Sequence, residues 1–279
     1  MPATLTTLPE LKEYLGIASE DEDVLLASLI ERVSAAIQRL TGRDLVETEH
    51  RAERHSGDGG PWLRLRHYPL VSVARLSIGV RLPMRVANNS EVSGAFGAWV
   101  EVTPSAVELR LVSWPDADSD SLALAEHATV SDLIDAINAM GKGWAASLAV
   151  PACGAVPATD LLPTRGSRWA LDAPAPLDAP AEPDNAWRAE HPDAGVLYRE
   201  AGFPKGVGNI VVDYTSGFAD VPGDLRHACV MWAAAVHNRL KDGGDGLRSE
   251  SLGPLGQVFD HQAPPDAMRI IEARREVLA

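Results

Sequence analysis

The sequence has 279 residues, of which 46% are hydrophobic, and its formal net charge is −14. This length and hydrophobic content suit one large or two small globular domains and exclude an intrinsically disordered chain. A net acidic chain is a poor candidate for tight binding to nucleic acid, because phosphate binding needs clustered Lys and Arg. An acidic wall would suit a channel along which DNA slides, although solubility alone is the plainer explanation of the charge.

Cysteine usage and the N-terminal residues suggest a protein made in a cytosol. Cys153 and Cys229 are the only cysteines in the sequence, too few for a disulfide framework or for a zinc site of the usual spacing. The sequence contains no apolar stretch near the roughly 20 residues that cross a bilayer. Met1–Thr6 lacks the basic and apolar regions of a signal peptide. We therefore expect two ordinary thiols and no membrane contact.

The first forty residues predict two helices. Leu8–Leu15 is a short helix that ends at Gly16. A longer helix follows over about 20–42, where Ser19 and Glu22 have the spacing of a capping box. Its apolar stripe, at spacings of three to four residues, consists of Leu25, Leu29, Val33, Ile37 and Leu40.

Residues 45–78 predict β structure. Polar and apolar residues alternate weakly over Leu45–Arg54, and Gly57–Gly60 has the composition of a turn. Apolar and basic residues alternate over Trp62–Arg66, and Val71–Ile78 resumes the strand pattern.

Residues 79–150 have the pattern of a small domain of their own. Trp99–Val102 and Val107–Val112 predict a hairpin, Thr129 caps a short helix, and Trp144–Val150 predicts a further strand. We interpret this β-β-α-β order as an inserted α+β domain.

Residues 151–195 are rich in proline. Eight of the chain's twenty prolines fall between Pro151 and Pro192. Because proline lacks the N–H that helices and ladders need, this stretch cannot be a regular helix or a central strand. We expect an extended Pro-rich arm or linker.

Regular structure returns near the C-terminus. Val196–Tyr198 and Asn209–Tyr214 predict strands, and Pro222 suits the first residue of a helix that runs to about Lys241. A flexible loop through 249–259 leads to a last helix over about 266–278.

A metal site is imaginable near the first strands, where three histidines and three acids occur: His50, His55, His67, Glu47, Glu49 and Glu53. Alternation along a strand, however, puts the three acids on one face and His50 on the other. We therefore interpret this segment as a solvated charged surface and predict no metal site.

The remaining motifs do not predict catalysis. His227 and His237 are ten residues apart, not four as in His-Glu-x-x-His, and we expect them at a surface or interface. The glycines of Gly202–Gly208 lead into a strand, whereas a phosphate loop leads into a helix. Asp116–Asp120 lacks the Gly and Glu of a calcium loop and is expected to be a solvated turn. The sequence contains no nucleophile elbow, so we predict no catalytic residues, no cofactor and no enzyme activity.

Motifs at the two ends of the chain follow a specific order. They are Leu40–Arg43 at the end of a capped helix, Leu63–Val73, Ile210–Phe218, Val221–Leu225 before an Ala-rich helix, and Arg248–Gly253. In this order they resemble the head–tail connector (adaptor) family of long-tailed bacteriophages, over about 5–78 and 196–279. The large central insertion departs from the shorter family members.

The resemblance implies a structural neck protein of the virion. Family members form a homo-oligomeric ring, typically a dodecamer, between the portal protein and a downstream stopper or tail-terminator protein. The ring extends the DNA channel, and viral DNA passes through its lumen without sequence-specific binding. Such a protein would be present in the host cytoplasm during assembly and in the neck, between head and tail, afterwards.

The predicted fold is therefore α+β: a helical connector core with a small antiparallel β region, interrupted by a β-β-α-β insertion domain and a Pro-rich arm. The core is discontinuous, over 1–78 and 196–279, with the inserted domain over 79–150 and the arm or linker over 151–195. The candidate contacts with the portal or neck are Arg248, Ser249, Glu250, Leu252, Phe259, Ile270 and Arg274.

Three other functions stay open at this point. A neck stopper or tail-completion protein would be mostly a β-barrel, which the long helices over 20–42 and 222–241 disfavour. A soluble hydrolytic enzyme would have a cleft with perturbed carboxylates. A binding module built on the insertion is the third.

Overall fold

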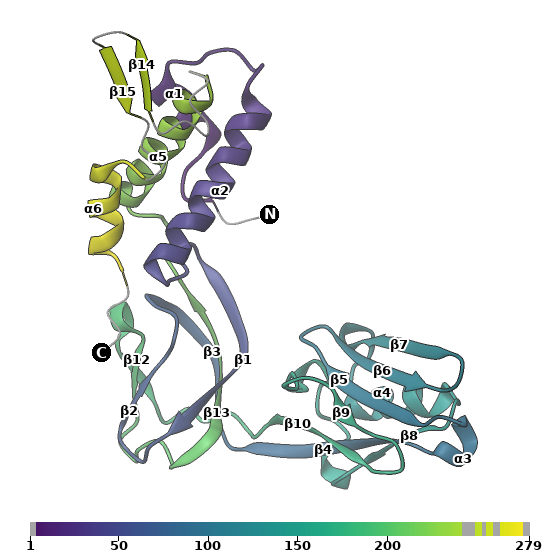
Figure 1. Cartoon of the computed structure of the whole chain (residues 1–279). Helices are drawn as coiled ribbons and strands as arrows, with labels where there is room; N and C mark the ends of the chain where they lie inside the picture. Colours follow the sequence, from purple (N-terminus) through teal and green to yellow (C-terminus); the bar gives the residue numbers. More distant parts are fainter. Residues whose placement is uncertain (1–3, 242–248, 253–254, 259–262, 276–279) are drawn as a thin grey trace.

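The computed structural model describes residues 4–241, 249–252, 255–258 and 263–275. Figure 1 shows a group of helices above two small sheets, with a further module set to one side of the sheets. The named strands pair antiparallel throughout these residues. The chain is thus a mixed α and β protein with antiparallel sheets, which confirms the predicted class at that level.

Four helices form what we call the helical head: α1 (Leu8–Leu15), α2 (Asp23–Thr41), α5 (Gly223–Lys241) and α6 (Pro265–Ala273). α2 and α5 lie side by side, and α6 packs against both (Figure 1). Ala228 and Ala233 on α5 are fully buried, and their small side chains let the helix backbones approach closely. The apolar core of the head includes Leu5, Leu11, Leu26, Ile30, Ile37, Leu225, Cys229 and Ile271.

The first two helices begin differently from one another. Thr7 and Glu10 form a capping box at the start of α1. The capping box predicted from Ser19 and Glu22 is wrong, because α2 begins at Asp23 and Glu22 makes no side-chain cap. Instead, the Glu22 carboxylate lies 2.6 Å from Nε2 of His237 on α5. His237 is buried and connects α5 to the start of α2 through this contact, so it is not a surface histidine.

Two three-stranded sheets lie below the head. The central sheet has the order β1 (Thr48–Gly57), β13 (Gly206–Ser216), β3 (Leu70–Ile78). The side sheet has the order β11 (Arg188–His191), β12 (Val196–Tyr198), β2 (Trp62–Arg64). A second apolar core belongs to these strands and their loops, and includes Leu63, Leu65, Leu76, Leu197, Phe203, Ile210, Val212 and Tyr214.

A β-bulge interrupts β1 in its middle. His50 pairs with Tyr214 and Glu53 pairs with Val212, so β1 has one extra residue over this step. Ala52 takes a positive φ of 55° there, and its N–H donates to Asp213 Oδ1 at 2.6 Å. The bulge reverses the side-chain alternation, and Glu53 therefore points inward. The solvated surface predicted for Glu53 is wrong for this reason.

The module to one side of these sheets, which we call the side module, contains two further sheets, a short helix α3 (Ser90–Ser93) and the helix α4 (Val130–Ala139). One sheet has the order β10 (Ala175–Pro180), β4 (Val80–Asn88), β8 (Trp144–Leu148). The other has the order β7 (Ala117–Ala123), β6 (Ala106–Val112), β5 (Gly97–Val102), β9 (Arg168–Trp169). A third apolar core fills this module, and its buried members all lie between Met84 and Ala179.

The proline-rich stretch is extended but packed. β10 is an edge strand beside β4, a position that proline tolerates. Leu161 and Leu177 are buried in the core of the module. Buried residues of this stretch, from Cys153 to Ala179, therefore belong to the apolar core of the module.

The module joins the central sheet through two adjacent strands. Val80 at the start of β4 pairs with Pro180 at the end of β10. The Ala181 N–H donates to the Gly79 carbonyl at 3.1 Å, and Asp184 N–H donates to the Leu76 carbonyl of β3 at 2.7 Å. The chain thus leaves and re-enters the central part at neighbouring positions.

Two local predictions are wrong in their secondary structure. Asp116–Asp120 was expected to be a turn, but Asp118 and Asp120 lie in β7, where Lys142 pairs with both at 2.6 and 2.9 Å. The loop expected over 249–259 contains a hairpin of β14 (Ser249–Leu252) and β15 (Leu255–Val258). Among the helices that the structure describes, none combines the length and apolarity needed to span a membrane.

Candidate functional site

The residues predicted to contact the portal lie in and around the C-terminal elements. Arg248 and Phe259 fall outside the described residues. Ser249, Glu250 and Leu252 belong to β14. Their role stays a prediction.

The other two predicted contacts are engaged inside the helical head. Ile270 on α6 is half-buried against the apolar core. Arg274 pairs with Asp224 of α5 at 2.9 Å between Nη2 and Oδ2, and its carbonyl accepts from Arg43 Nη1 at 3.3 Å. Arg274 therefore ties the end of α6 to α5 and to the residues after α2.

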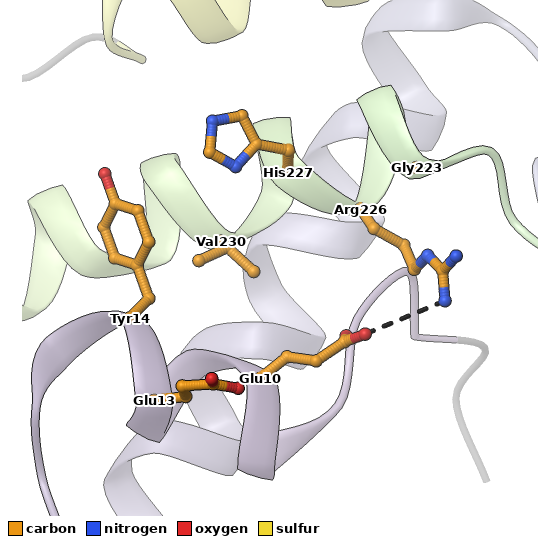
Figure 2. A pocket seen from close by; sticks show the side chains of 7 residues that line it. All are labelled: Glu10, Glu13, Tyr14, Gly223, Arg226, His227 and Val230. Atoms are coloured by element: carbon orange, nitrogen blue, oxygen red, sulfur yellow. Dashed lines mark ion pairs between the residues drawn. The ribbon is translucent and has the colours of Figure 1, made fainter.

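A groove of about 510 Å³ runs between α1 and α5. Figure 2 shows side chains from the two helices facing each other across it, with Tyr14 and the acids on α1 and the basic residues on α5. Its lining residues are Glu10, Glu13, Tyr14, Gly223, Arg226, His227 and Val230. The groove is amphipathic and lies on the surface of the head, a position that suits contact with another protein.

The polar groups of the groove are partly paired. Arg226 Nη1 lies 3.7 Å from Glu10 Oε1, the dashed line of Figure 2. Hydrogen bonds from the Thr6 hydroxyl and the Thr7 N–H lower the pKa of Glu10, and the charge of Arg226 lowers it further. Tyr14 and His227 meet edge to face at 6.1 Å between ring centroids. Tyr14 is nevertheless 53% exposed, so its ring is free to contact a neighbour.

A second cluster of polar groups lies where the head meets the central sheet, and we call it the junction cluster. It consists of Asp44 after α2, His50 on β1 and His67 before β3. Asp44 Oδ2 lies 2.8 Å from His67 Nδ1 and 3.6 Å from His50 Nε2. The two imidazole rings stack at 4.1 Å with an angle of 8° between their planes. The two histidines stand out in the sequence, whereas Asp44 does not, because it lies outside the strand that contains His50.

Buried groups surround the junction cluster. The Tyr214 hydroxyl donates to Glu53 Oε2 at 3.0 Å and accepts from the His67 N–H at 3.2 Å. Burial and the neighbouring Glu53 carboxylate raise the pKa of Tyr214. Glu53 is half-buried, and hydrogen bonds and the charge of His55 outweigh the effect of this burial and lower the pKa of Glu53. No pattern in the sequence reveals that Glu53 lies beside the cluster, because the bulge at Ala52 brings it inward.

The described residues thus form a mixed α and β protein with an amphipathic groove on the surface of its helical head. Residues 5–63, which span α1, α2, β1 and the start of β2, match the family model for phage gp6-like head-tail connector protein. This match confirms the resemblance predicted from the sequence, over less than half of the chain. The comparison with curated proteins found no match.

Three solved structures resemble the whole chain weakly. The neck of an empty GTA particle computed with C6 symmetry has 15% identity and a TM-score of 0.36, covering 99% of this chain and 91% of that one. The virion of a native gene transfer agent (GTA) particle has 16% identity and a TM-score of 0.36, with the same coverage of 99% and 91%. The neck of a native GTA particle computed with C12 symmetry has 16% identity and a TM-score of 0.34, covering 100% and 97%. These TM-scores are too low to establish a shared fold.

Proposed function

We propose that the chain is a structural neck protein of a phage-like particle, which forms a ring between the portal and the tail. The proposal rests on the match of residues 5–63 to the connector family. These residues build half of the helical head and the first strand of the central sheet. The ring would extend the DNA channel, and DNA would pass through it without sequence-specific contacts.

The surface of the helical head supports a contact between copies. Tyr14, Val24, Leu25 and Leu240 are exposed apolar or aromatic side chains on its helices. Closing a ring would remove such side chains from water, at about 25 cal/mol for each Å² of apolar surface. The amphipathic groove between α1 and α5 would lie in the same contact. Twelve copies, the number typical of the family, is the stoichiometry we propose.

The division into a connector core and an insertion is part of the same proposal. Among the described residues, the apolar cores of the head and of the central and side sheets consist of residues within 1–78 and 196–279, apart from the half-buried Trp187. The core of the side module draws only on residues between Met84 and Ala179. We propose that the insertion includes most of the proline-rich stretch, because its buried side chains pack in that core. The hairpin of β14 and β15, together with α6, would face the portal.

Other functions fit the described structure less well. A stopper protein built mainly as a β-barrel would lack the two 19-residue helices α2 and α5. A hydrolytic enzyme would need a nucleophile beside a base, or a carboxylate with a raised pKa, in a cleft. In the groove of Figure 2, the pKa of Glu10 is lowered instead.

Native mass spectrometry with and without the matching portal protein tests the proposal. We expect a stoichiometric collar on portal rings, even if the isolated chain is a monomer. Tyr14→Ser should weaken collar formation, whereas Trp114→Ser, at a still more exposed position on the side module, should leave it unchanged. Absence of binding to the portal, together with turnover of a small substrate, would favour the enzyme instead.

A further inference from the structure

The junction cluster has the composition of a transition-metal site. Two imidazoles and one carboxylate, from His50, His67 and Asp44, offer ligand atoms that all lie within 4.8 Å of one another. All three residues are half-buried, so the cluster is neither freely solvated nor sealed. From this geometry we propose that the three residues bind one zinc ion, which clamps the helical head to the central sheet.

The distances from Asp44 to the two histidines are close to those of a zinc site. Zinc takes bonds of about 2.0–2.1 Å to His nitrogen and Asp oxygen in a tetrahedron, which places neighbouring ligand atoms about 3.3 Å apart. Asp44 Oδ2 lies 2.8 Å from His67 Nδ1 and 3.6 Å from His50 Nε2, on either side of that value. The two ring nitrogens must close from a separation of no more than 4.8 Å. The rings must also rotate out of their parallel stack, because a bound ion lies in the plane of each imidazole that holds it.

The surroundings of the cluster supply what metal-binding histidines require. Such a histidine usually presents its other ring nitrogen to a carboxylate, which orients the ring and raises its basicity. Glu53 Oε2 lies 3.7 Å from His67 Nε2. Tyr214 in turn donates to Glu53 and accepts from the His67 backbone. The Ser216 hydroxyl lies 2.8 Å from His50 Nε2, the nitrogen that also faces Asp44, and would give up this hydrogen bond when that nitrogen binds the ion.

The ligand types select the class of metal. Imidazole nitrogen with a single carboxylate suits Zn²⁺ and other transition-metal ions such as Fe²⁺, Cu²⁺ and Ni²⁺, whereas Mg²⁺ and Ca²⁺ prefer sites made only of oxygen. The three ligands come from separate segments: the residues after α2, the strand β1 and the segment before β3. A bound ion would therefore fix the angle between the head and the central sheet. The zinc site would form whether or not the chain assembles into an oligomeric ring.

Titration of the untagged chain with metal, after removal of bound ions with a chelator, tests the site. Isothermal calorimetry should give one Zn²⁺ per chain, Co²⁺ should show the visible bands of a four- or five-coordinate ion, and Mg²⁺ should not compete. His50→Ala and His67→Ala should each weaken zinc binding by roughly tenfold or more, since each removes a ligand. His191→Ala, at an exposed histidine on β11, should bind as the wild type does.

Two conservative variants keep the test decisive if the alanine variants do not fold. Asp44→Asn removes the charged ligand, and Glu53→Gln removes the carboxylate beside His67 at nearly constant volume. Each should weaken zinc binding by about 10–100-fold while circular dichroism stays that of the wild type. Zinc should also raise the melting temperature of the wild type and not that of Asp44→Asn. Failure of the wild type to bind zinc, or equal binding by Asp44→Asn, would overturn the proposal.

Discussion

Charged side chains in the helical head mainly join segments that are far apart in the sequence. Glu22 reaches His237, Lys12 pairs with Asp23 at 2.6 Å, and Arg274 pairs with Asp224. The sequence shows the residue types but not these partners, because each pair forms only after the helices pack. Glu22 is the clearest case, since its position near a helix start suggested a local cap while its partner lies on another helix.

Glu10→Gln should destabilise the chain by about 0.5–1 kcal/mol at neutral pH, since it weakens the capping box of α1. Hydrogen bonds from Thr6 and Thr7, with the charge of Arg226, hold the pKa of Glu10 below its usual value. A folded-state pKa that is lowered stabilises the fold above the usual pKa, and this stabilisation is lost as the pH falls through the lowered value. Chemical denaturation at neutral and acidic pH should show the difference from wild type shrinking in acid. Glu13→Gln, the control, should change stability little; equal losses in both variants would contradict this account.

Cys229 should react slowly with thiol reagents in the folded chain. Burial raises its pKa to about 11, so little thiolate is present at neutral pH. Its Sγ lies 3.5 Å from the Ser34 hydroxyl inside the core of the head. Labelling followed by mass spectrometry should find Cys229 modified only after denaturant is added. Rapid labelling in the folded state would show that the head opens or packs differently.

Among the helices and strands, some features can be predicted from the sequence and others cannot. The helix over 130–139 was expected from its cap and apolar face, and it forms with Thr129 and Asp132 in a capping box. The hairpin of β5 and β6 was expected from alternation, and its strands pair as predicted. The bulge in β1 was missed, because one extra residue leaves no mark on composition and yet reverses every later side chain. The inward position of Glu53 beside the junction cluster was missed with it.

Ala52→Gly should stabilise the chain by about 0.5–1 kcal/mol. Ala52 has φ of 55° at the bulge, a conformation that costs about 1–2 kcal/mol for a residue with a Cβ and little for glycine. Ala145→Gly, at an exposed position inside β8, is the matched control and should destabilise by about the usual 0.5–1 kcal/mol. Denaturant midpoints measure both, and a loss of stability in Ala52→Gly would contradict the bulge.

At the scale of the whole molecule, three apolar cores divide the chain. The long helices and the hairpin of β5 and β6 were readable from the sequence, but the strands β4, β7, β10 and β11 were not. The packing of the proline-rich stretch was also not readable, because buried residues such as Leu161 and Leu177 are scattered among prolines without a period. The role of the residues expected to contact the portal stays a prediction. Ile270 and Arg274 proved to be packed or paired within the head, while the groove between α1 and α5 appeared only once the helices were placed side by side.

Removal of residues 81–179, with a two-residue turn joining Val80 to Pro180, should leave a folded core. These two residues pair across β4 and β10, so a short hairpin connection spans the gap. Far-UV circular dichroism should retain the helical signal of α2 and α5, and thermal unfolding should stay cooperative. Loss of all helical signal would show that the side module is needed for the core to fold.

An image of the neck by cryo-electron microscopy, in particles assembled with this chain, tests the central claim most directly. The account predicts copies of the chain arranged about the symmetry axis between portal and tail, with helical heads in contact through the α1 and α5 surface. It also predicts that residues 1–78 and 196–279 form one body in each copy. A neck whose axis is surrounded by other proteins only, or a copy whose terminal parts belong to separate bodies, would contradict it.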